Sequence, residues 1–268
     1  MTIIFRAKSD QAYVIKILAE LIANNIKTGC FEIDDKGIYL RMMDHHKKVL
    51  IDFQLNAENF SLYKFESKKM FLGINLNHLY KMVRATKKKD SIELYIDDAQ
   101  PNDLAIKVTP KDNNRVTIST VKIQQIQNLD IELPTIDTKP INVPSSEYQK
   151  MIKELGHIGN IIKVSAKTYS INFSTSASGV YGRDVKFGEN SDEDTTEKVK
   201  YSQTFNTENL CRITKLSGLS TNIQVYPGSP FLFKSKIGNL GVISIYIKSI
   251  EELEVESHNV EESDSDYE

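Results

Sequence analysis

The chain has little cysteine and no long apolar run, and both shortages restrict the class of protein to which it can belong. Its 268 residues include two cysteines, Cys30 and Cys211, which lie far apart in the sequence. A framework of disulfides is not expected, and a reducing compartment fits. The segment MTIIFRAKSD lacks the apolar centre of a signal peptide, and no run approaches the roughly 20 apolar residues of a membrane span. We therefore expect a soluble, intracellular protein.

Motifs of catalysis are also scarce. The sequence contains no phosphate-binding loop, dinucleotide-binding fingerprint, nucleophile elbow or paired-cysteine metal motif. The Asp-His-His run at 44–46 is similar to metal-dependent phosphoesterases, in which aspartates and histidines hold two ions that activate water. Such a site needs more aspartates, and only Asp34, Asp35 and Asp52 lie near in the sequence. This enzyme is a remote alternative, which metal-dependent turnover that requires His45 would support.

Acidic residues are few over most of the chain because they are concentrated in two segments. The formal net charge is −2, from 34 Lys and Arg against 36 Asp and Glu. Residues 251–268 contain nine acidic residues and no Lys or Arg, and residues 189–197 contain five more acidic residues. The remainder has 34 basic against 22 acidic residues. We predict a disordered acidic tail at 251–268, an exposed acidic loop at 189–197 and a basic body.

Three expected helices each carry two basic residues three positions apart, beside an apolar stripe. In one of them the stripe includes Leu76, Leu79 and Val83. On a helix this spacing places the basic pair on one face and the apolar stripe on another. A positive face that recurs along the chain favours a polyanion, such as a nucleic-acid backbone, as the partner. The pairs are Lys81/Arg84, Lys150/Lys153 and Arg212/Lys215.

The first half of the chain can be laid over the second half at an offset of roughly 133 residues. Expected helices at 11–24 and 146–156 are each followed by two alternating runs, CFEIDDKGIYLRMM and IIKVSAKTYSINFS. Later in each half, NLNHLYKMVRAT and NTENLCRITKLS are typical of a helix that precedes a strand. The pattern predicts two copies of one α+β unit. The expected boundaries are 1–125 for the first domain, 126–140 for a connector, 141–250 for the second domain and 251–268 for the tail.

Four segments, in the right order and spacing, resemble the eukaryotic and archaeal sliding clamp family, proliferating cell nuclear antigen. They are GIYLRMMDHHKKVLIDFQL, FLGINLNHLYKMVRATKKKDSIELYI, PSSEYQKMIKELGHIGNIIKVSAK and PFLFKSKIGNLGVISIYI. The resemblance covers Ile3 to Ser249. It implies the sliding-clamp fold, with two duplicated α+β domains, each with two short helices packed on antiparallel sheets, and three chains closed into a ring.

The function that the resemblance implies is that of a DNA sliding clamp. A homotrimeric ring would encircle double-stranded DNA and tether DNA polymerase and other replication and repair proteins, as a processivity factor. An ATP-dependent clamp loader would open the ring, and the clamp itself would need no cofactor and perform no chemistry. The site of action would be the nucleus, or a cytoplasmic replication site if a large DNA virus encodes the chain. A subunit of a heteromeric checkpoint-type clamp and a monomeric DNA-binding processivity factor are the alternatives.

The resemblance places basic side chains of the helices against DNA, because phosphate contacts hold a duplex without reading its sequence. The first helix departs from the family, since Ile17 and Ala23 stand at two family basic positions. Three lysines at 87–89 add charge after the second helix. The DNA-facing candidates are Lys16, Lys81, Arg84, Lys150, Lys153, His157, Arg212 and Lys215.

The resemblance also implies a pocket for short peptides with one aliphatic and two aromatic anchors, contributed by replication and repair proteins. The connector, QNLDIELPTIDTKPINVP, is rich in proline and lacks helical periodicity, as an extended crossing segment requires. Lys47, Lys48, Lys248 and Ser249 replace family residues beside this pocket, which favours more acidic peptides. The pocket candidates are Met43, Leu50, Ile131, Leu133, Pro134, Pro230, Tyr246 and Ile247.

Subunits would meet through edge strands, whose unpaired backbone groups another copy of the chain can satisfy. The family places this contact near residues 115–120 and 183–187. The interface candidates are Val116, Ile118, Val185 and Phe187.

Overall fold

The computed structural model describes residues 3–112, 114–188 and 198–265, with the side chains of the last helix described to residue 258. The acidic loop expected at 189–197 lies outside the described residues. The first half of the chain begins with a strand and a helix, continues with strands, and returns to a helix before its last three strands. Its elements are β1 (Ile3–Ser9), α1 (Ala12–Ala23), β2 (Thr28–Ile33), β3 (Gly37–Met43), β4 (Val49–Asn56), η1 (Ala57–Asn59), β5 (Leu62–Phe65), β6 (Met70–Asn75), α2 (Leu76–Val83), β7 (Ser91–Asp97), β8 (Asp103–Thr109) and β9 (Thr117–Gln124).

The second half follows a similar order and adds one helix at its end; among the described residues it has four strands, instead of five, between its first two helices. Its elements are β10 (Ile141–Pro144), α3 (Ser145–Gly156), β11 (Ile161–Ala166), β12 (Ser170–Ala177), β13 (Tyr181–Gly188), β14 (Tyr201–Asn206), α4 (Thr207–Arg212), η3 (Thr214–Gly218), β15 (Asn222–Tyr226), β16 (Phe231–Ile237), β17 (Gly241–Ile247) and α5 (Ile250–Ser265). The prediction of a duplicated α+β unit is therefore confirmed.

One antiparallel sheet runs through both halves. Thirteen strands form it in the order β10-β15-β16-β17-β4-β3-β2-β6-β9-β8-β7-β1-β5, and a second sheet has the order β13-β12-β11-β14. The halves join where β17 pairs with β4, from Gly241 opposite Leu55 to Ile247 opposite Val49. The backbone hydrogen bonds of this ladder make the halves one continuous sheet rather than two separate ones.

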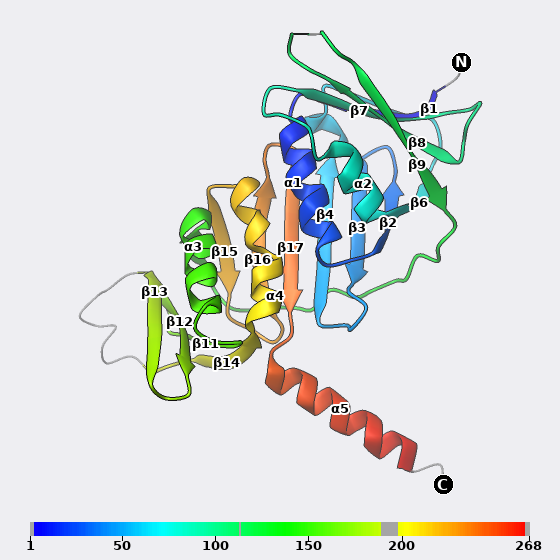
Figure 1. The fold of residues 1–268 in the computed structure, drawn as a ribbon. Helices are drawn as coiled ribbons and strands as arrows, with labels where there is room; N and C mark the ends of the chain where they lie inside the picture. Colours follow the sequence, from blue (N-terminus) through cyan, green and yellow to red (C-terminus); the bar gives the residue numbers. More distant parts are fainter. Residues whose placement is uncertain (1–2, 113, 189–197, 266–268) are drawn as a thin grey trace.

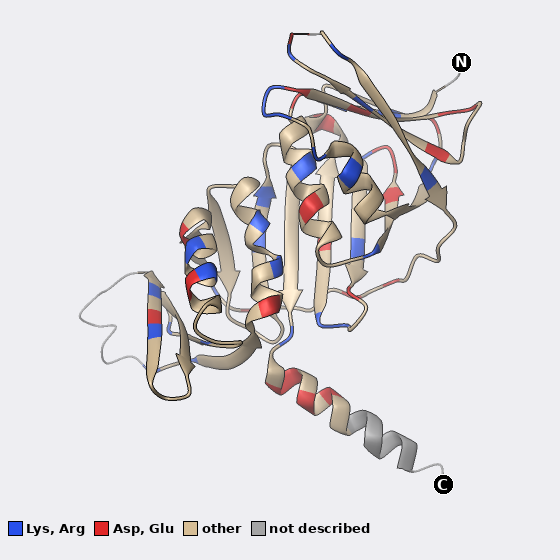
Figure 2. Ribbon diagram, in the orientation of Figure 1, with Lys and Arg blue, Asp and Glu red and all other residues tan. Residues whose placement is uncertain are grey.

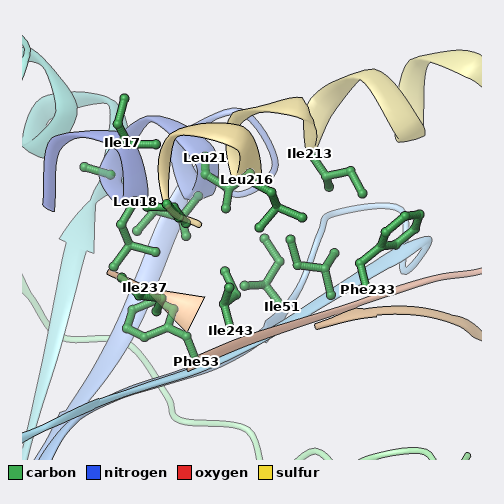
Figure 3. Close-up of a cluster of buried hydrophobic side chains, with 14 of the residues drawn as sticks. Ile17, Leu18, Leu21, Ile51, Phe53, Ile213, Leu216, Phe233, Ile237 and Ile243 are labelled. Carbon is green, nitrogen blue, oxygen red and sulfur yellow. The ribbon is translucent and has the colours of Figure 1, made fainter. Parts of the chain in front are cut away.

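Helices α1 to α4 lie together on one face of this sheet (Figure 1). α1 contacts both α2 and η3, and α3 contacts both α4 and η3. Beneath them, Leu21 of α1 and Leu216 of η3 share one buried cluster with Phe53 of β4 and Phe233 of β16 (Figure 3). The helical layer is thus held by a core to which both halves contribute.

The helix predicted for the NTENLCRITKLS segment is divided in the structure. α4 ends at Arg212, and Ile213, with φ −98° and ψ 2°, precedes the separate turn η3. The hydroxyl of Thr214 donates to the carbonyl oxygen of Cys211 at 2.7 Å. Side-chain bonds of this kind compete with the backbone bonds of a helix. The expectation that Arg212 and Lys215 share the face of one α-helix is therefore wrong.

The acidic tail, predicted to be disordered, begins as helix α5. The Ser249 hydroxyl accepts from the Glu252 N–H at 3.1 Å, and the Glu252 carboxylate accepts from the Ser249 N–H at 2.7 Å. This reciprocal capping box satisfies N–H groups at the helix start. Glu251 accepts from the N–H and hydroxyl of Thr204 on β14, at 3.0 and 2.7 Å. The prediction that the chain is disordered from residue 251 onward is therefore wrong.

No helix in the described part of the chain is long and apolar enough to cross a membrane.

Candidate nucleic-acid face and partner surface

The predicted DNA-facing residues all lie in the helical layer. They are Lys16 on α1, Lys81 on α2 and Arg84 at its C-terminal cap, Lys150 and Lys153 on α3 and His157 at its C-terminal cap, Arg212 on α4 and Lys215 on η3. Figure 2 shows these basic positions along α1 to α4, with acidic positions between them. The fold therefore brings together on one layer side chains that are distant in the sequence.

Carboxylates of the same layer pair with three of these cations. The pairs are Lys150–Glu147 at 2.8 Å, Arg212–Glu208 at 2.5 Å and Lys215–Glu20 at 2.6 Å. The hydrogen bond to its carboxylate raises the pKa of Lys150. In contrast, Lys81, Arg84 and Lys153 are exposed and form no ion pair with any residue that the structure describes. These three cations are the most available to an external polyanion.

Lys16 and Ile17 have different surroundings although they are neighbours on α1. The Lys16 ammonium donates to the Thr86 carbonyl oxygen at 3.4 Å and lies 5.5 Å from the centroid of the Tyr13 ring. Ile17 is 6% exposed, and a Cβ atom at Gly218 of η3 would lie 3.0 Å from its Cγ2. The isoleucine at this family basic position therefore packs α1 against the second half instead of facing solvent.

The lysines at 87–89 follow α2 and are exposed. The buried carboxylate of Asp90 accepts from the Lys87 N–H at 2.8 Å, which fixes the turn. The Lys88 ammonium lies 5.7 Å from the Tyr13 ring centroid, the same ring that Lys16 approaches. The added charge of Lys88 thus lies beside the N-terminal end of α1. Ala23, the second departure from the family, is half-buried against the main core.

Five apolar side chains form a row across adjacent strands on the other face of the sheet. The register places Met43 opposite Leu50, Leu50 opposite Tyr246, Tyr246 opposite Leu232, and Leu232 opposite Tyr226. Successive side chains of a strand point to opposite faces, so this row points away from the helices. Met43, Leu50 and Tyr246 are predicted from the sequence, whereas Leu232 and Tyr226 are not. Their alternation with inward-facing residues on strands near Tyr246 was the signal that could have identified them.

The connector between the halves crosses this row. Residues 125–140 contain no helix or strand, and the segment passes behind the sheet, on the face opposite the helices (Figure 1). Ile131 and Ile136 pack against the row. Arg41 holds the connector, since its Nη1 donates to the Ile131 carbonyl oxygen at 3.2 Å and its Nε to Asp52 at 2.8 Å. We call the row and these two isoleucines the outer apolar surface.

Four predicted pocket residues lie outside the outer apolar surface. Ile247 is fully buried in the main core, because the alternation that turns Tyr246 outward turns its neighbour inward. The prediction for Ile247 is therefore wrong. Leu133 is 36% exposed, and Pro134 and Pro230 are half-buried. Burial, together with the nearby Asp52 carboxylate, raises the pKa of Tyr246, so its hydroxyl stays neutral at physiological pH.

The edges of β9 and β13 are among the strand edges that stay open within the described residues. From Thr117 to Lys122, β9 pairs only with β8, and β13 pairs only with β12. Val116 and Ile118 beside the first edge are 49% and 57% exposed. Val185 and Phe187 of β13 instead pack partly against the main core, so this edge offers mainly its backbone. The two edges lie at opposite ends of the molecule (Figure 1).

The Asp-His-His run forms a tight turn between β3 and β4. The buried carboxylate of Asp44 accepts from the N–H groups of Lys48 and Val49 at 2.7 and 2.9 Å. Asp52 is bound to Arg41, as described above. No group of three His, Cys, Asp or Glu side chains that could hold a metal ion occurs among the described residues. The turn therefore provides a structural role for Asp44.

Comparison with known proteins places the chain in a family. The family models for the N-terminal and C-terminal domains of proliferating cell nuclear antigen match residues 4–133 and 133–250. The proliferating cell nuclear antigen of Dictyostelium discoideum is 25% identical over 254 residues, 91% of this chain and 98% of that protein. That of Chaetomium thermophilum is 24% identical over 250 residues, 90% of this chain and 96% of the relative.

A viral protein and a solved structure are also similar. The probable DNA polymerase sliding clamp 1 of Paramecium bursaria Chlorella virus 1 is 22% identical over 256 residues, 92% of this chain and 97% of that protein. The crystal structure of the antigen from Entamoeba histolytica has a TM-score of 0.80 and 18% identity, and covers 92% of this chain and 99% of that one. The architecture is thus the two-domain clamp fold.

Both halves match, so the chain belongs to the proliferating cell nuclear antigen family. Sliding clamps of this family are processivity factors without enzymatic activity. Family membership therefore argues against the phosphoesterase alternative, and it agrees with the structural role of Asp44 in its turn.

Proposed function

We propose that this chain is the subunit of a DNA sliding clamp, a ring that encircles duplex DNA and tethers DNA polymerase and other replication and repair proteins to it. Membership of the proliferating cell nuclear antigen family supports the assignment to the class of sliding clamps. The observation that carries the proposal is the helical layer on one face of a continuous sheet. There Lys81, Arg84 and Lys153 are exposed and form no ion pair with any residue in the described part of the chain.

The ring is proposed to be a homotrimer that closes through the open edges of β9 and β13. The exposed backbone of β9 on one subunit would pair with β13 of the next, so that the edges at opposite ends of each chain are satisfied. A contact between different patches closes a ring when the rotation between subunits is right. In this arrangement the exposed Ile118 side chain would be buried between two subunits.

The mechanism is topological rather than chemical. Phosphate contacts position a duplex without reading its bases, so the ring can move along DNA without leaving it. A polymerase held by the ring stays at high effective concentration near the primer end. An ATP-dependent loader would open the ring to admit DNA. The proposed location is the nucleus, or a viral replication site in the cytoplasm.

The outer apolar surface is the proposed site for peptides of the partner proteins. It combines aliphatic and aromatic side chains with the neutral Tyr246 hydroxyl, and the connector forms one of its walls. Apolar anchors of a short peptide gain most of their binding energy from such a surface.

The DNA part of the proposal is tested with the double variant Lys81→Ala/Arg84→Ala. Log Kd for a short duplex should depend less steeply on log salt, with the slope reduced by about two, because two phosphate contacts are lost. The control is Lys234→Ala/Lys236→Ala, which removes two exposed cations from β16, outside the helical layer. Its slope should remain that of the wild type. Equal slopes for both variants would refute the assignment of the helical layer to DNA.

A further inference from the structure

A hollow of about 750 Å³ lies where the helical layer meets the turn between β3 and β4. We call it the basic groove. Its walls come from three parts of the chain: the end of α3, with Lys153 and His157; α4, with Arg212; and the β3–β4 turn, with His46 and Lys48. The turn belongs to the hairpin that also carries Met43 and Leu50 of the outer apolar surface. The groove therefore begins on the helical face and ends beside the partner surface.

The charge in the basic groove is mostly positive. Lys48, Lys153 and Arg212 are opposed by one carboxylate of the lining, Glu208, and this carboxylate is already paired with Arg212. Lys48 and Lys153 form no ion pair with any described residue. Two cations of different elements thus face one hollow without a counter-charge, which creates a positive potential inside it.

The turn that carries His46 and Lys48 is held at both ends. The buried Asp44 carboxylate accepts from the Lys48 N–H at 2.7 Å, and the Lys48 carbonyl oxygen accepts from the Lys248 N–H at 3.0 Å. The imidazole rings of His45 and His46 lie with their centroids 5.2 Å apart. The cations of the groove are therefore presented by a fixed backbone, unlike those of a free surface loop.

We propose that the basic groove binds backbone phosphates of DNA where the duplex leaves the ring, so that His46 and Lys48 extend the DNA surface beyond the helices. The inference rests on the proposed function. Continuity favours DNA as the occupant, because Lys153, His157 and Arg212 belong to both the groove and the helical face. Amide and hydroxyl groups in the lining can add neutral hydrogen bonds to phosphate oxygens.

The test uses the full chain with His46→Ala/Lys48→Ala and a fluorescent short duplex as the probe. Kd should rise several-fold at low salt, and the slope of log Kd against log salt should fall by about one, since one lysine contact is lost. The matched control is Lys47→Asn, which removes a cation from the same turn but outside the groove lining. Lys47 has φ 55°, a conformation that asparagine tolerates. Its slope should equal that of the wild type.

The outcomes separate this inference from the proposed function. A reduced slope for Lys81→Ala/Arg84→Ala with an unchanged slope for His46→Ala/Lys48→Ala would overturn the groove alone. Unchanged slopes for both would overturn the clamp interface as well. If DNA binding is unchanged but an acidic peptide binds more weakly, the groove is a peptide site and the inference is wrong. Equal thermal midpoints and equal oligomer mass show that the variants are folded.

Discussion

Single residues between α1 and η3 join the two halves of the helical layer. Ile17 packs against Gly218, and the Glu20 carboxylate pairs with the Lys215 ammonium at 2.6 Å. The isoleucine, which is 6% exposed, adds apolar burial between the halves. Ile17 and the Glu20–Lys215 ion pair thus hold α1 against the second half of the chain.

Replacing Ile17 with alanine should lower the free energy of unfolding by about 2 to 4 kcal/mol, because a buried side chain is cut back and leaves a cavity. DNA affinity should stay unchanged, since Ile17 does not face the solvent. Chemical denaturation measures the first effect and duplex binding the second. Met82→Ala on α2, where the side chain is 38% exposed, is the control and should cost much less. Equal losses of unfolding free energy in the two variants would contradict the packing role of Ile17.

At the scale of elements, helix α5 is attached to the body mainly through its first turn. Burial raises the pKa of Glu251, but the hydrogen bonds from Thr204 and nearby groups outweigh it, and the pKa is lowered from 4.5. A carboxyl group of this kind contributes stability above its unfolded-state pKa and loses it as the pH falls through the folded-state pKa. Attachment of α5 should therefore weaken in acid.

The chain contains no tryptophan, so a single tryptophan at Val255, which is 61% exposed on α5, reports this element alone. Its fluorescence anisotropy should fall as the pH drops below 4.5, the ordinary value for Glu251. In a Val255→Trp/Glu251→Ala protein the anisotropy should be low already at neutral pH and change little in acid. An identical acid transition in both proteins would show that Glu251 does not anchor the helix.

The connector is a second element, and its contribution to peptide binding can be tested one residue at a time. Ile131 packs on the outer apolar surface, and Leu133, two residues later, is 36% exposed and outside it. Ile131→Ala should weaken binding of a partner peptide by about 1 kcal/mol or more, roughly fivefold. Leu133→Ala should have a smaller effect. Titration with a labelled peptide measures both, and duplex binding should be the same in the two variants. If Leu133→Ala weakened peptide binding more than Ile131→Ala does, the peptide site would lie at a different part of the connector.

At the scale of the whole molecule, the open edges of β9 and β13, with the exposed Ile118 beside the first, predict an oligomer. Light scattering over a dilution series should give about 90 kDa, three times the chain mass of 30.5 kDa, because each edge finds its partner on a neighbour. Ile118→Lys should shift the mass toward that of one chain. Val242→Lys, at a 43% exposed site on β17 away from both edges, should not. A monomeric wild type would instead favour a heteromeric ring or a factor that does not encircle DNA.

The sequence by itself determined the duplication, the α+β class and the basic positions of the helices, because these depend on local periodicity and on spacing along the chain. It also gave Met43, Leu50 and Tyr246 as partner-site candidates, through resemblance. Alternation on a strand is equally local, and it would have been sufficient to exclude Ile247, a pocket candidate together with its outward-facing neighbour Tyr246.

Only the tertiary structure decided which cations are free. Lys215 is neutralised by Glu20, nearly 200 residues away in the sequence, whereas Lys81 and Arg84 are not paired within the described residues. It also decided that β17 pairs with β4, that Leu232 and Tyr226 complete the outer row, and that α5 is anchored by Thr204. Each of these contacts joins segments that no local pattern relates, since it depends on the path of the folded chain.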